Sequence, residues 1–282
     1  MRPAGNSWVW RQNSGRFTIC SDGVKHVPLG DSIGRAAELI VSAKHAVAFT
    51  GAGISTPSGI PDFRSPESGL WTKDDPMVVA SIHTFRTEPV VFYEWIRPTA
   101  RLFAEAEPNA AHLALAELEE SGLLKAVITQ NIDNLHQRAG SKRVLELHGH
   151  LREAVCMRCR RIIPVEGLVQ RYMVEGKVPY CQDCGGALKP MAVLMGEPLP
   201  MDVFLDAQLE SELCDLMLVV GSSLTVVLAA NLPLAACRQG AALIIVDYRE
   251  TWADAVADVV IRGEVAEVLP HIVLACRDGM AL

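Results

Sequence analysis

The stretch from Gly51 to Arg64, GAGISTPSGIPDFR, decides how the rest of the chain is interpreted. It begins just after a short apolar run, Ala46 to Phe49, which predicts a buried strand followed by a tight glycine turn. Because glycine has no side chain, the backbone of such a turn can approach a phosphate closely. A plain strand-to-loop turn is the alternative interpretation when this stretch is considered alone.

The glycine spacing departs from the dinucleotide fingerprint of Rossmann domains. That fingerprint needs a third glycine at position 56, where Thr56 stands instead. Pro57 and Pro61 also prevent a long helix from starting at once, since proline lacks the amide hydrogen. We therefore expect the turn to run into a polar loop that carries Asp62 and Arg64 over a ligand.

Short apolar runs, mostly β-branched, alternate with helical patterns along the remaining chain. Such alternation predicts an α/β fold, a Rossmann-like parallel sheet with helices on both faces and a site at the carboxyl ends of its strands. Gly51, Gln130, His148, Gly221 and Asp247 each directly follow a predicted strand, so we expect them along one edge. The predicted strands are Ala46–Phe49, Ala126–Thr129, Val144–Leu147, Val193–Met195, Leu216–Val220, Ala242–Val246 and Val259–Ile261, and the predicted helices are Ile33–Lys44, Pro89–Arg97, Ala110–Glu120, Ala229–Cys237 and Glu264–Cys276.

Four of the eight cysteines form two Cys-x-x-Cys pairs, separated by 21 residues, and Gly185 and Gly186 follow the second pair. This spacing is typical of a zinc ribbon, in which four thiolates hold one Zn²⁺ tetrahedrally. No coordination position stays open for a substrate, so the zinc is expected to be structural and to hold a small inserted module. A redox dithiol is the alternative. The predicted ligands are Cys156, Cys159, Cys181 and Cys184.

Two further stretches complete the set of motifs. Thr129 to His136 reads TQNIDNLH, and Leu147 to Gly149 reads LHG. Together with the glycine stretch and the cysteine pairs, they resemble the sirtuin family of NAD-dependent protein deacylases, in its bacterial type. The similarity runs from about residue 33 to residue 270, with the motifs in the family's order.

The resemblance implies that NAD is the cofactor and that His148, Asn131 and Asp133 are the catalytic residues. His148 would accept a proton from the nicotinamide ribose after the acyl oxygen has attacked C1', and an unperturbed histidine pKa suits this at neutral pH. Asn131 and Asp133 would surround the nicotinamide ribose and carboxamide. Turn formation and capping are the alternative roles for Asn and Asp, and a structural role is the alternative for a lone histidine.

Other cofactor contacts are implied by the resemblance along the same sheet edge. Hydroxyl and backbone donors at Ser222 and Ser223 suit phosphate or ribose oxygens. Asp247 stands where the family commonly has an asparagine, but a carboxylate also accepts hydrogen bonds from ribose hydroxyls and would discriminate against a 2'-phosphate. The full set of these contacts is Gly51, Ala52, Gly53, Thr56, Asp62, Phe63, Arg64, Gln130, Ile132, Gly221, Ser222, Ser223, Asp247 and Val265.

An acyl-lysine peptide is the substrate that the resemblance implies, bound as an extended strand between two domains. Leu194 and Met195 stand where phenylalanines are frequent. The Tyr-x-x-Arg pair of the subgroup that removes acidic acyl groups is unmatched, because Ile96 lies three residues after Tyr93. The implied substrate contacts are Phe63, Val193, Leu194, Met195, Gly196, Glu197 and Val226.

The expected function is NAD-dependent protein lysine deacylation, which yields nicotinamide, free lysine and O-acyl-ADP-ribose. A protein mono-ADP-ribosyltransferase and a non-catalytic NAD- or ADP-ribose-sensing module are the alternatives. We divide the chain into a loosely ordered extension over residues 1–30, a Rossmann-like NAD-binding domain over 31–150 and 188–282, and a zinc-binding module over 151–187.

Composition limits the partners and the compartment. A net charge of −7 gives no electrostatic footprint for nucleic acid, and no apolar run approaches the roughly eighteen residues that cross a bilayer. The start of the chain lacks the apolar core of a secretory signal, although four basic residues against one acidic residue in positions 1–30 leave a transit peptide as an alternative. The other cysteines are scattered singly, which favours reduced thiols. We therefore expect a cytoplasmic monomer that binds neither nucleic acid nor membrane.

Overall fold

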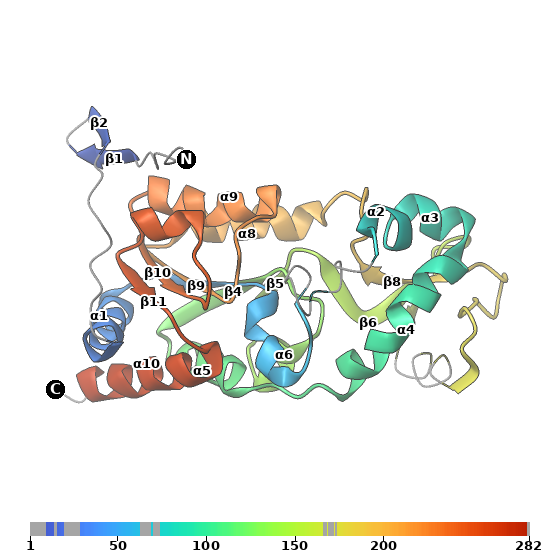
Figure 1. Ribbon diagram of the computed structural model, residues 1–282, viewed down its shortest axis with the longest axis horizontal. Coiled ribbons are helices and arrows are strands. Elements are labelled where there is room, and N and C mark those ends of the chain that lie inside the picture. The colour runs from blue at the N-terminus through green and yellow to red at the C-terminus, as the bar shows by residue number, and fades with distance from the viewer. Residues whose placement is uncertain are drawn as a thin grey trace, which may run out of the picture.

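A six-stranded parallel sheet forms the centre of the structure (Figure 1). The computed structural model describes residues 10–13, 16–19, 29–62, 69, 74–165, 168, 172 and 174–280. Counted along the chain, the strands of this sheet lie in the order 3-2-1-4-5-6 of a Rossmann fold, which confirms the predicted fold class. From one edge to the other they are β11 (Val259–Ile261), β10 (Ala242–Val246), β9 (Leu216–Val220), β3 (Ala46–Thr50), β4 (Leu124–Thr129) and β5 (Val144–Glu146).

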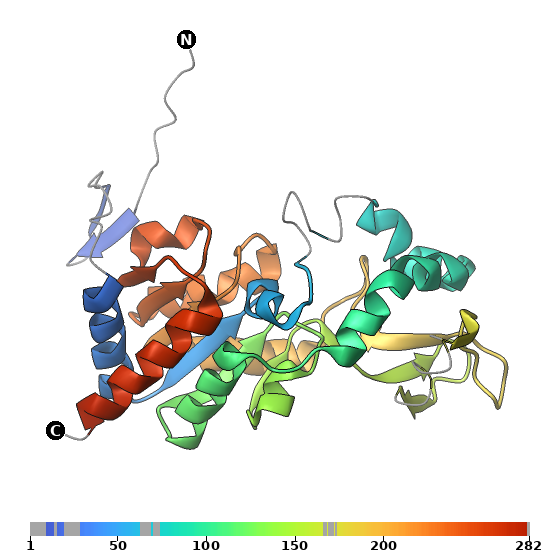
Figure 2. The same ribbon diagram turned by 60° about the horizontal axis from the view of Figure 1, so that its bottom comes forward.

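A second, smaller lobe lies beside the sheet, at the right of Figure 2. Its antiparallel strands have the order β7 (Ile162–Pro164), β6 (Gly149–Cys156) and β8 (Leu188–Ala192). Helices α2 (Pro76–Val79), α3 (Ile82–Thr87) and α4 (Pro89–Glu105) lie on this side, and α3 and α4 share an apolar cluster with Tyr172 and Leu194. This small sheet begins before residue 151 and ends after residue 187, the bounds predicted for the zinc module. The division into domains stays a prediction.

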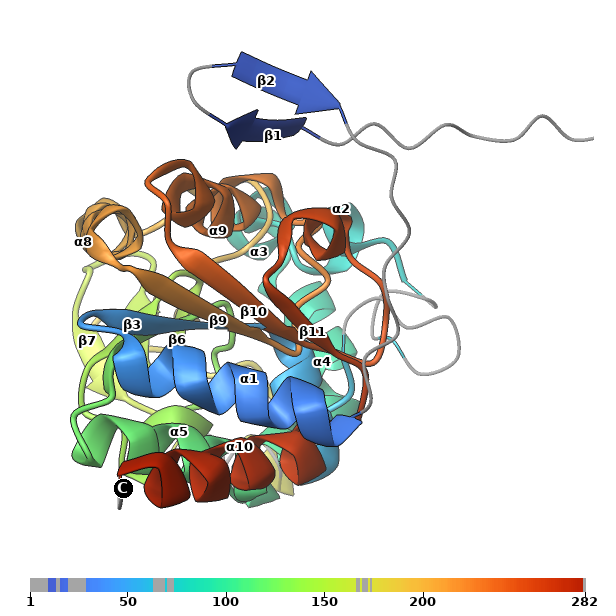
Figure 3. The same ribbon diagram turned by 90° about the vertical axis from the view of Figure 1, so that its left-hand side faces the viewer.

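Helices cover both faces of the large sheet (Figure 3). The strands are buried on both sides, and successive residues point to opposite faces, so Ala46 and Ala48 join one core while Val47 and Phe49 join the other. One face carries α1 (Leu29–Ser42), α5 (Ala110–Glu120) and α10 (Val265–Met280), and the other carries α8 (Met201–Leu213) and α9 (Val227–Arg238).

Several predicted elements have the predicted bounds, namely the helix Ala110–Glu120 and the strands Leu216–Val220, Ala242–Val246 and Val259–Ile261. Helix α4 runs past its predicted end, because Pro98 lies inside the helix and does not terminate it. Helix α1 begins at Leu29, within the stretch assigned to the extension. Further upstream, β1 (Trp10–Asn13) and β2 (Arg16–Ile19) pair antiparallel.

The predicted strand Val193–Met195 is wrong. These residues follow β8 and form no strand of either sheet, although Met195 makes an isolated bridge to Ser81. Their amides are satisfied by three different partners: Val193 donates to the His148 carbonyl, Leu194 to the Glu197 carboxylate and Met195 to the Ala80 carbonyl. The segment is therefore an irregular connection that joins the two lobes, and its apolar residues line a cavity.

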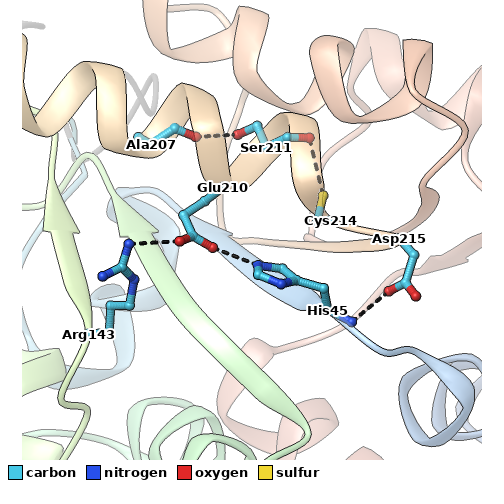
Figure 4. A network of polar contacts seen from close by, with 7 residues as sticks. All are labelled: His45, Arg143, Ala207, Glu210, Ser211, Cys214 and Asp215. Carbon is cyan, nitrogen blue, oxygen red and sulfur yellow. Dashed lines mark hydrogen bonds and ion pairs between the residues drawn. The ribbon is translucent and has the colours of Figure 1, made fainter.

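A polar network holds the amino ends of the strands (Figure 4). The Asp215 carboxylate accepts hydrogen bonds from the amides of Lys44 at 2.8 Å and His45 at 2.9 Å, where β3 begins. The Glu210 carboxylate, on α8, accepts from Arg143 Nη2 and from the His45 ring, both at 2.7 Å. These contacts tie α8 to the starts of β3 and β5.

Among the described residues, no helix is long and apolar enough to cross a membrane. The monomeric state and the cytoplasmic location stay predictions from the sequence.

Candidate active site

A cavity of about 340 Å³ lies where the carboxyl ends of the large sheet meet the small lobe. Most residues that the sequence analysis assigned to cofactor or substrate line it, so the predicted convergence at one sheet edge is present. These residues are Gly51, Ala52, Gly53, Asp62, Gln130, Asn131, Ile132, His148, Val193, Leu194, Met195, Gly196, Glu197, Gly221, Ser222, Ser223 and Val226.

A few assigned residues do not line the cavity. Thr56 is exposed and donates a hydrogen bond from Oγ1 to the Gly53 carbonyl at 3.0 Å. Asp133 and Asp247 are buried, and Val265 belongs to the apolar core at the start of α10. Phe63 and Arg64 lie outside the described residues.

The glycine turns after β3 and β9 pack directly on each other. The Gly53 amide donates to the Gly221 carbonyl at 2.8 Å, and a Cβ on Gly53 would come within 2.8 Å of Gly221 Cα. Gly221 has a φ of +58°, and a Cβ there would collide with the Ile54 amide. These glycines are therefore required by turn-to-turn packing at the point where the strand order reverses, which is where dinucleotides bind in such sheets.

His148 is held at the junction of the two lobes. Gly149 has a φ of +70°, and any side chain there would collide with the Met191 carbonyl as the chain turns into β6. The His148 carbonyl accepts from the Val193 amide at 2.8 Å, and ring atom Nδ1 lies 2.9 Å from the Gln130 carbonyl. Because a carbonyl only accepts, Nδ1 carries a proton, and in the neutral ring Nε2 is the acceptor nitrogen. This tautomer suits a proton acceptor.

Asn131 and Asp133 are joined through Ser55. Asn131 Nδ2 donates to the Gly51 carbonyl at 3.1 Å and to Ser55 Oγ at 3.0 Å, while Ser55 Oγ donates to Asp133 Oδ2 at 2.7 Å. The Leu135 amide donates to Asp133 Oδ1 at 2.9 Å. Burial raises the pKa of the Asp133 carboxyl despite these two hydrogen bonds, which lower it.

Ser55 is a further polar residue of the site, and the sequence motifs predict no role for it. Its Oγ lies 3.5 Å from Nε2 of His112, and burial lowers the pKa of that histidine to about 4, so the ring is neutral at physiological pH. The signal was present in the sequence, because Ser55 is a hydroxyl residue inside the glycine stretch itself.

An apolar half of the cavity was also missed. Phe92, Trp95, Ile96 and Phe103 of α4 line it. The spacing of Phe92, Trp95 and Ile96 is that of one helix face, which indicates a shared apolar surface but does not distinguish a core from a cavity wall. Arg249, which lies at the other end of the cavity, was likewise not assigned.

The four paired cysteines converge in the small lobe as predicted. Their sulfur atoms all lie within 4.8 Å of one another, with Cys156 to Cys184 at 3.4 Å and Cys159 to Cys181 at 3.9 Å. Sulfurs about 2.3 Å from a tetrahedral Zn²⁺ would be spaced by roughly 3.8 Å, so these residues fit such an ion. A Cβ on Gly186 would lie 2.7 Å from Cys156 Sγ, which explains the glycine after the second pair.

Comparison with known proteins agrees with this geometry. The model of the Sir2 family matches residues 51–228. NAD-dependent protein deacylase 2 of Archaeoglobus fulgidus is 51% identical over 245 residues, covering 86% of this chain and 95% of that protein. Sir2Af2 bound to a myristoylated histone peptide is 43% identical with a TM-score of 0.77, over 89% of this chain and 99% of that one.

A further solved structure holds a deacetylated p53 peptide and 3'-O-acetyl-ADP-ribose on a Sir2 protein. It is 43% identical to this chain, with a TM-score of 0.80 over 85% of this chain and 96% of that one. The family model and a relative of this identity and coverage show that the chain belongs to the Sir2 family, the sirtuins.

Proposed function

We propose that this protein is an NAD-dependent protein lysine deacylase. The observation that carries the proposal is the His148 ring, which lies in the cavity with Nδ1 bonded to the Gln130 carbonyl and Nε2 as the acceptor nitrogen. The relative that is 51% identical bears the name of a deacylase, and two similar structures hold acylated or deacetylated peptides.

The residues at the sheet edge fit a dinucleotide. The cavity lies at the point where the strand order reverses, and Gln130 Nε2 donates to Ser222 Oγ at 3.0 Å, which ties two strand ends together beside the glycine turns. The turns at Gly51 and Gly221 would hold the diphosphate, and Asp247 would hold the adenosine ribose. When bound, NAD supplies the ribose carbon that receives the acyl oxygen as nicotinamide leaves.

His148 would take the proton from a ribose hydroxyl on Nε2, while the Gln130 carbonyl keeps the ring in the required tautomer. Asn131 would orient the nicotinamide ribose. Its amide is fixed by the Gly51 carbonyl and by Ser55, so it enters the reaction already positioned. Asp133 holds Ser55 from the buried side.

The peptide would lie between the lobes against residues 193–197. Glu197 closes a turn in this segment, because its amide donates to the Leu194 carbonyl at 2.9 Å and its carboxylate accepts from the Leu194 amide and the Lys189 ammonium, both at 2.9 Å. Beyond it, the apolar side chains of α4 would surround a neutral acyl chain. The myristoylated peptide on a similar protein supports an acyl chain as the ligand of this half.

Nicotinamide release measured with and without an acetyl-lysine peptide tests the function. Release that depends on the acyl peptide, with matched formation of deacylated peptide, is expected for wild type and absent in His148→Ala. Release without an acyl group, with ADP-ribose transferred to protein, would support the transferase instead. Binding of NAD with no release in any condition would leave only a sensing role.

The four thiolates would hold one structural Zn²⁺. Such sites contribute on the order of 10 kcal/mol to the folding of small modules. We expect Cys156→Ser to lose the metal and activity together, whereas Cys237→Ser, on α9, keeps both. Elemental analysis by mass spectrometry checks the metal content, and full activity in a verified metal-free preparation would contradict the assignment.

A further inference from the structure

Arg249 lies at the end of the cavity where the strand β10 finishes. Its backbone amide donates to Asp247 Oδ1 at 2.8 Å, which fixes the chain just beyond the strand. Its guanidinium then reaches across to Asp62, with Nη2 3.0 Å from Oδ2. Asp62 is 187 residues away in sequence and belongs to the loop that starts with the glycine turn after β3. The ion pair therefore connects two strand ends over one part of the cavity.

The charges along the cavity make Arg249 distinctive. Among the described residues that line it, Arg249 carries the one permanent positive charge. The carboxylates there are Asp62 and Glu197, and Glu197 is paired with Lys189 at 2.9 Å. Outside the cavity, the nearby Arg262 is ion-paired with Asp254.

A bound dinucleotide would bring a diphosphate with two negative charges to the same sheet edge. The glycine turns offer backbone N–H groups, which carry only partial charges. A guanidinium carries a full positive charge, and its planar set of N–H donors suits phosphate oxygens in a bidentate arrangement. The Arg249 side chain is 48% exposed and Asp62 is 9% exposed, so the carboxylate is the fixed partner and the guanidinium the accessible one.

We propose that Arg249 is a cationic ligand of the dinucleotide diphosphate and that Asp62 positions its guanidinium. The inference rests on the proposed use of NAD, and it adds a residue to which the sequence motifs assign no role. The alternative is that Arg249 only holds the loop containing Asp62 against the end of β10 and makes no contact with the phosphates.

Calorimetric titration with two ligands separates these cases. ADP-ribose carries the diphosphate, whereas adenosine carries no phosphate. We expect Arg249→Gln to weaken ADP-ribose binding by about tenfold or more, the range for a lost charge-assisted hydrogen bond, and to leave adenosine binding within about twofold. Arg35→Gln is the matched control, because Arg35 is an exposed partner of Glu38 on α1 and the net charge changes equally.

Arg249→Lys provides a second measure if the glutamine variant does not fold. An ammonium keeps the charge but cannot bind two oxygens in the planar arrangement, so ADP-ribose affinity is expected between those of wild type and Arg249→Gln. An equal loss for both ligands, or no loss for either, would overturn the inference and leave the proposed function intact. Wild-type protein that binds no ADP-ribose would overturn the proposed function as well.

Discussion

The two ends of the central sheet carry similar polar side chains and use them differently. At the amino ends of the strands, His45 and Arg143 are tied to Glu210 (Figure 4). At the carboxyl ends, Gln130 and His148 lie beside the glycine turns and line the cavity. Polar groups that satisfy one another stabilise a fold, whereas polar groups arranged around a cavity can bind a ligand. Their arrangement, and not their number, marks the functional end.

The buried carboxyl groups show the same difference. Glu210 accepts from Arg143 and the His45 ring. Asp133 accepts from Ser55 and the Leu135 amide, neither of which is charged, and burial raises its pKa. A carboxyl whose pKa is raised by folding adds stability below that pKa and loses it as the pH rises. Ionisation of Asp133 therefore lowers stability as the pH rises through its raised pKa, at the end where binding and catalysis are proposed.

Replacing a histidine by alanine at each end of the central sheet should separate the roles of the two ends most strongly. We expect His148→Ala to lower kcat by about 10² to 10⁴, since it removes the proposed proton acceptor, and to lower the unfolding free energy by no more than roughly 1 kcal/mol for the lost hydrogen bond to the Gln130 carbonyl. His45→Ala should leave kcat within about twofold and lower the unfolding free energy by roughly 1 kcal/mol, because Glu210 loses a hydrogen bond. Steady-state kinetics and denaturant titration measure the two effects. A His148→Ala enzyme within about tenfold of wild-type kcat would rule out the assignment.

Asp247 and Asp258 allow a carboxylate at each end of β10 to be compared. Asp247 follows the strand, whereas Asp258 Oδ2 accepts from the Leu243 amide at 2.9 Å, near its start. A hydrogen bond to a charged acceptor contributes about 1.5 to 3 kcal/mol, so Asp247→Ala should raise the KM for NAD by about tenfold or more. Asp258→Ala should leave that KM unchanged. Equal NAD affinity of wild type and Asp247→Ala in calorimetry would contradict the ribose contact.

Glu210→Gln tests whether the amino end only stabilises. The substitution keeps the shape of the side chain and removes the charge that Arg143 and His45 share. We expect the unfolding free energy to fall by about 1 to 3 kcal/mol with kcat unchanged, and the half-exposed Arg143 limits the loss. Glu38→Gln, an exposed member of an ion pair on α1, is the control. A loss of kcat without a loss of stability would contradict a purely structural role for Glu210.

The carboxyl end of the sheet is predictable from sequence because its residues directly follow the strands. Gly51, Gln130, His148 and Gly221 come within two residues of an apolar run, and parallel strands bring such positions to one edge. The predicted strand Val193–Met195 is wrong for the same reason, since a short apolar run does not distinguish a sheet strand from an irregular connection.

Helix α8 and the amino end could not be predicted in this way. The pattern of α8 is inverted, because Leu205 and Leu209 are 57% and 52% exposed while Glu210 and Ser211 are buried. Periodicity detects a helix only when its apolar residues face the core. Arg249 is a different case, because its place in the cavity depends on an ion pair with a residue far away in sequence, and no local pattern carries that information.

Within the carboxyl end, the apolar half of the cavity should discriminate among acyl chains by smaller amounts. Met195 lines this half together with Leu194 and Ile96. Its backbone is fixed, because the amide donates to the Ala80 carbonyl and the carbonyl accepts from the Ile82 amide at 3.0 Å. Only the side chain can then adapt, and methionine is unbranched and flexible where a phenylalanine ring would be rigid.

Each extra buried methylene should contribute up to about 0.8 kcal/mol, or roughly fourfold in kcat/KM, until the cavity is full. We therefore expect butyryl to octanoyl peptides to equal or exceed acetyl peptide with wild type. Succinyl peptide should react poorly, because Ile96 offers no charge to its carboxylate. Met195→Phe should remove the gain for the longer chains, whereas Met201→Phe, at an exposed position of α8, should keep it. If kcat/KM for acetyl peptide exceeds that for the longer chains by more than about tenfold, and Met195→Phe shows the same profile, Met195 does not shape this half of the cavity. Each added methylene would then lower kcat/KM instead of raising it through burial.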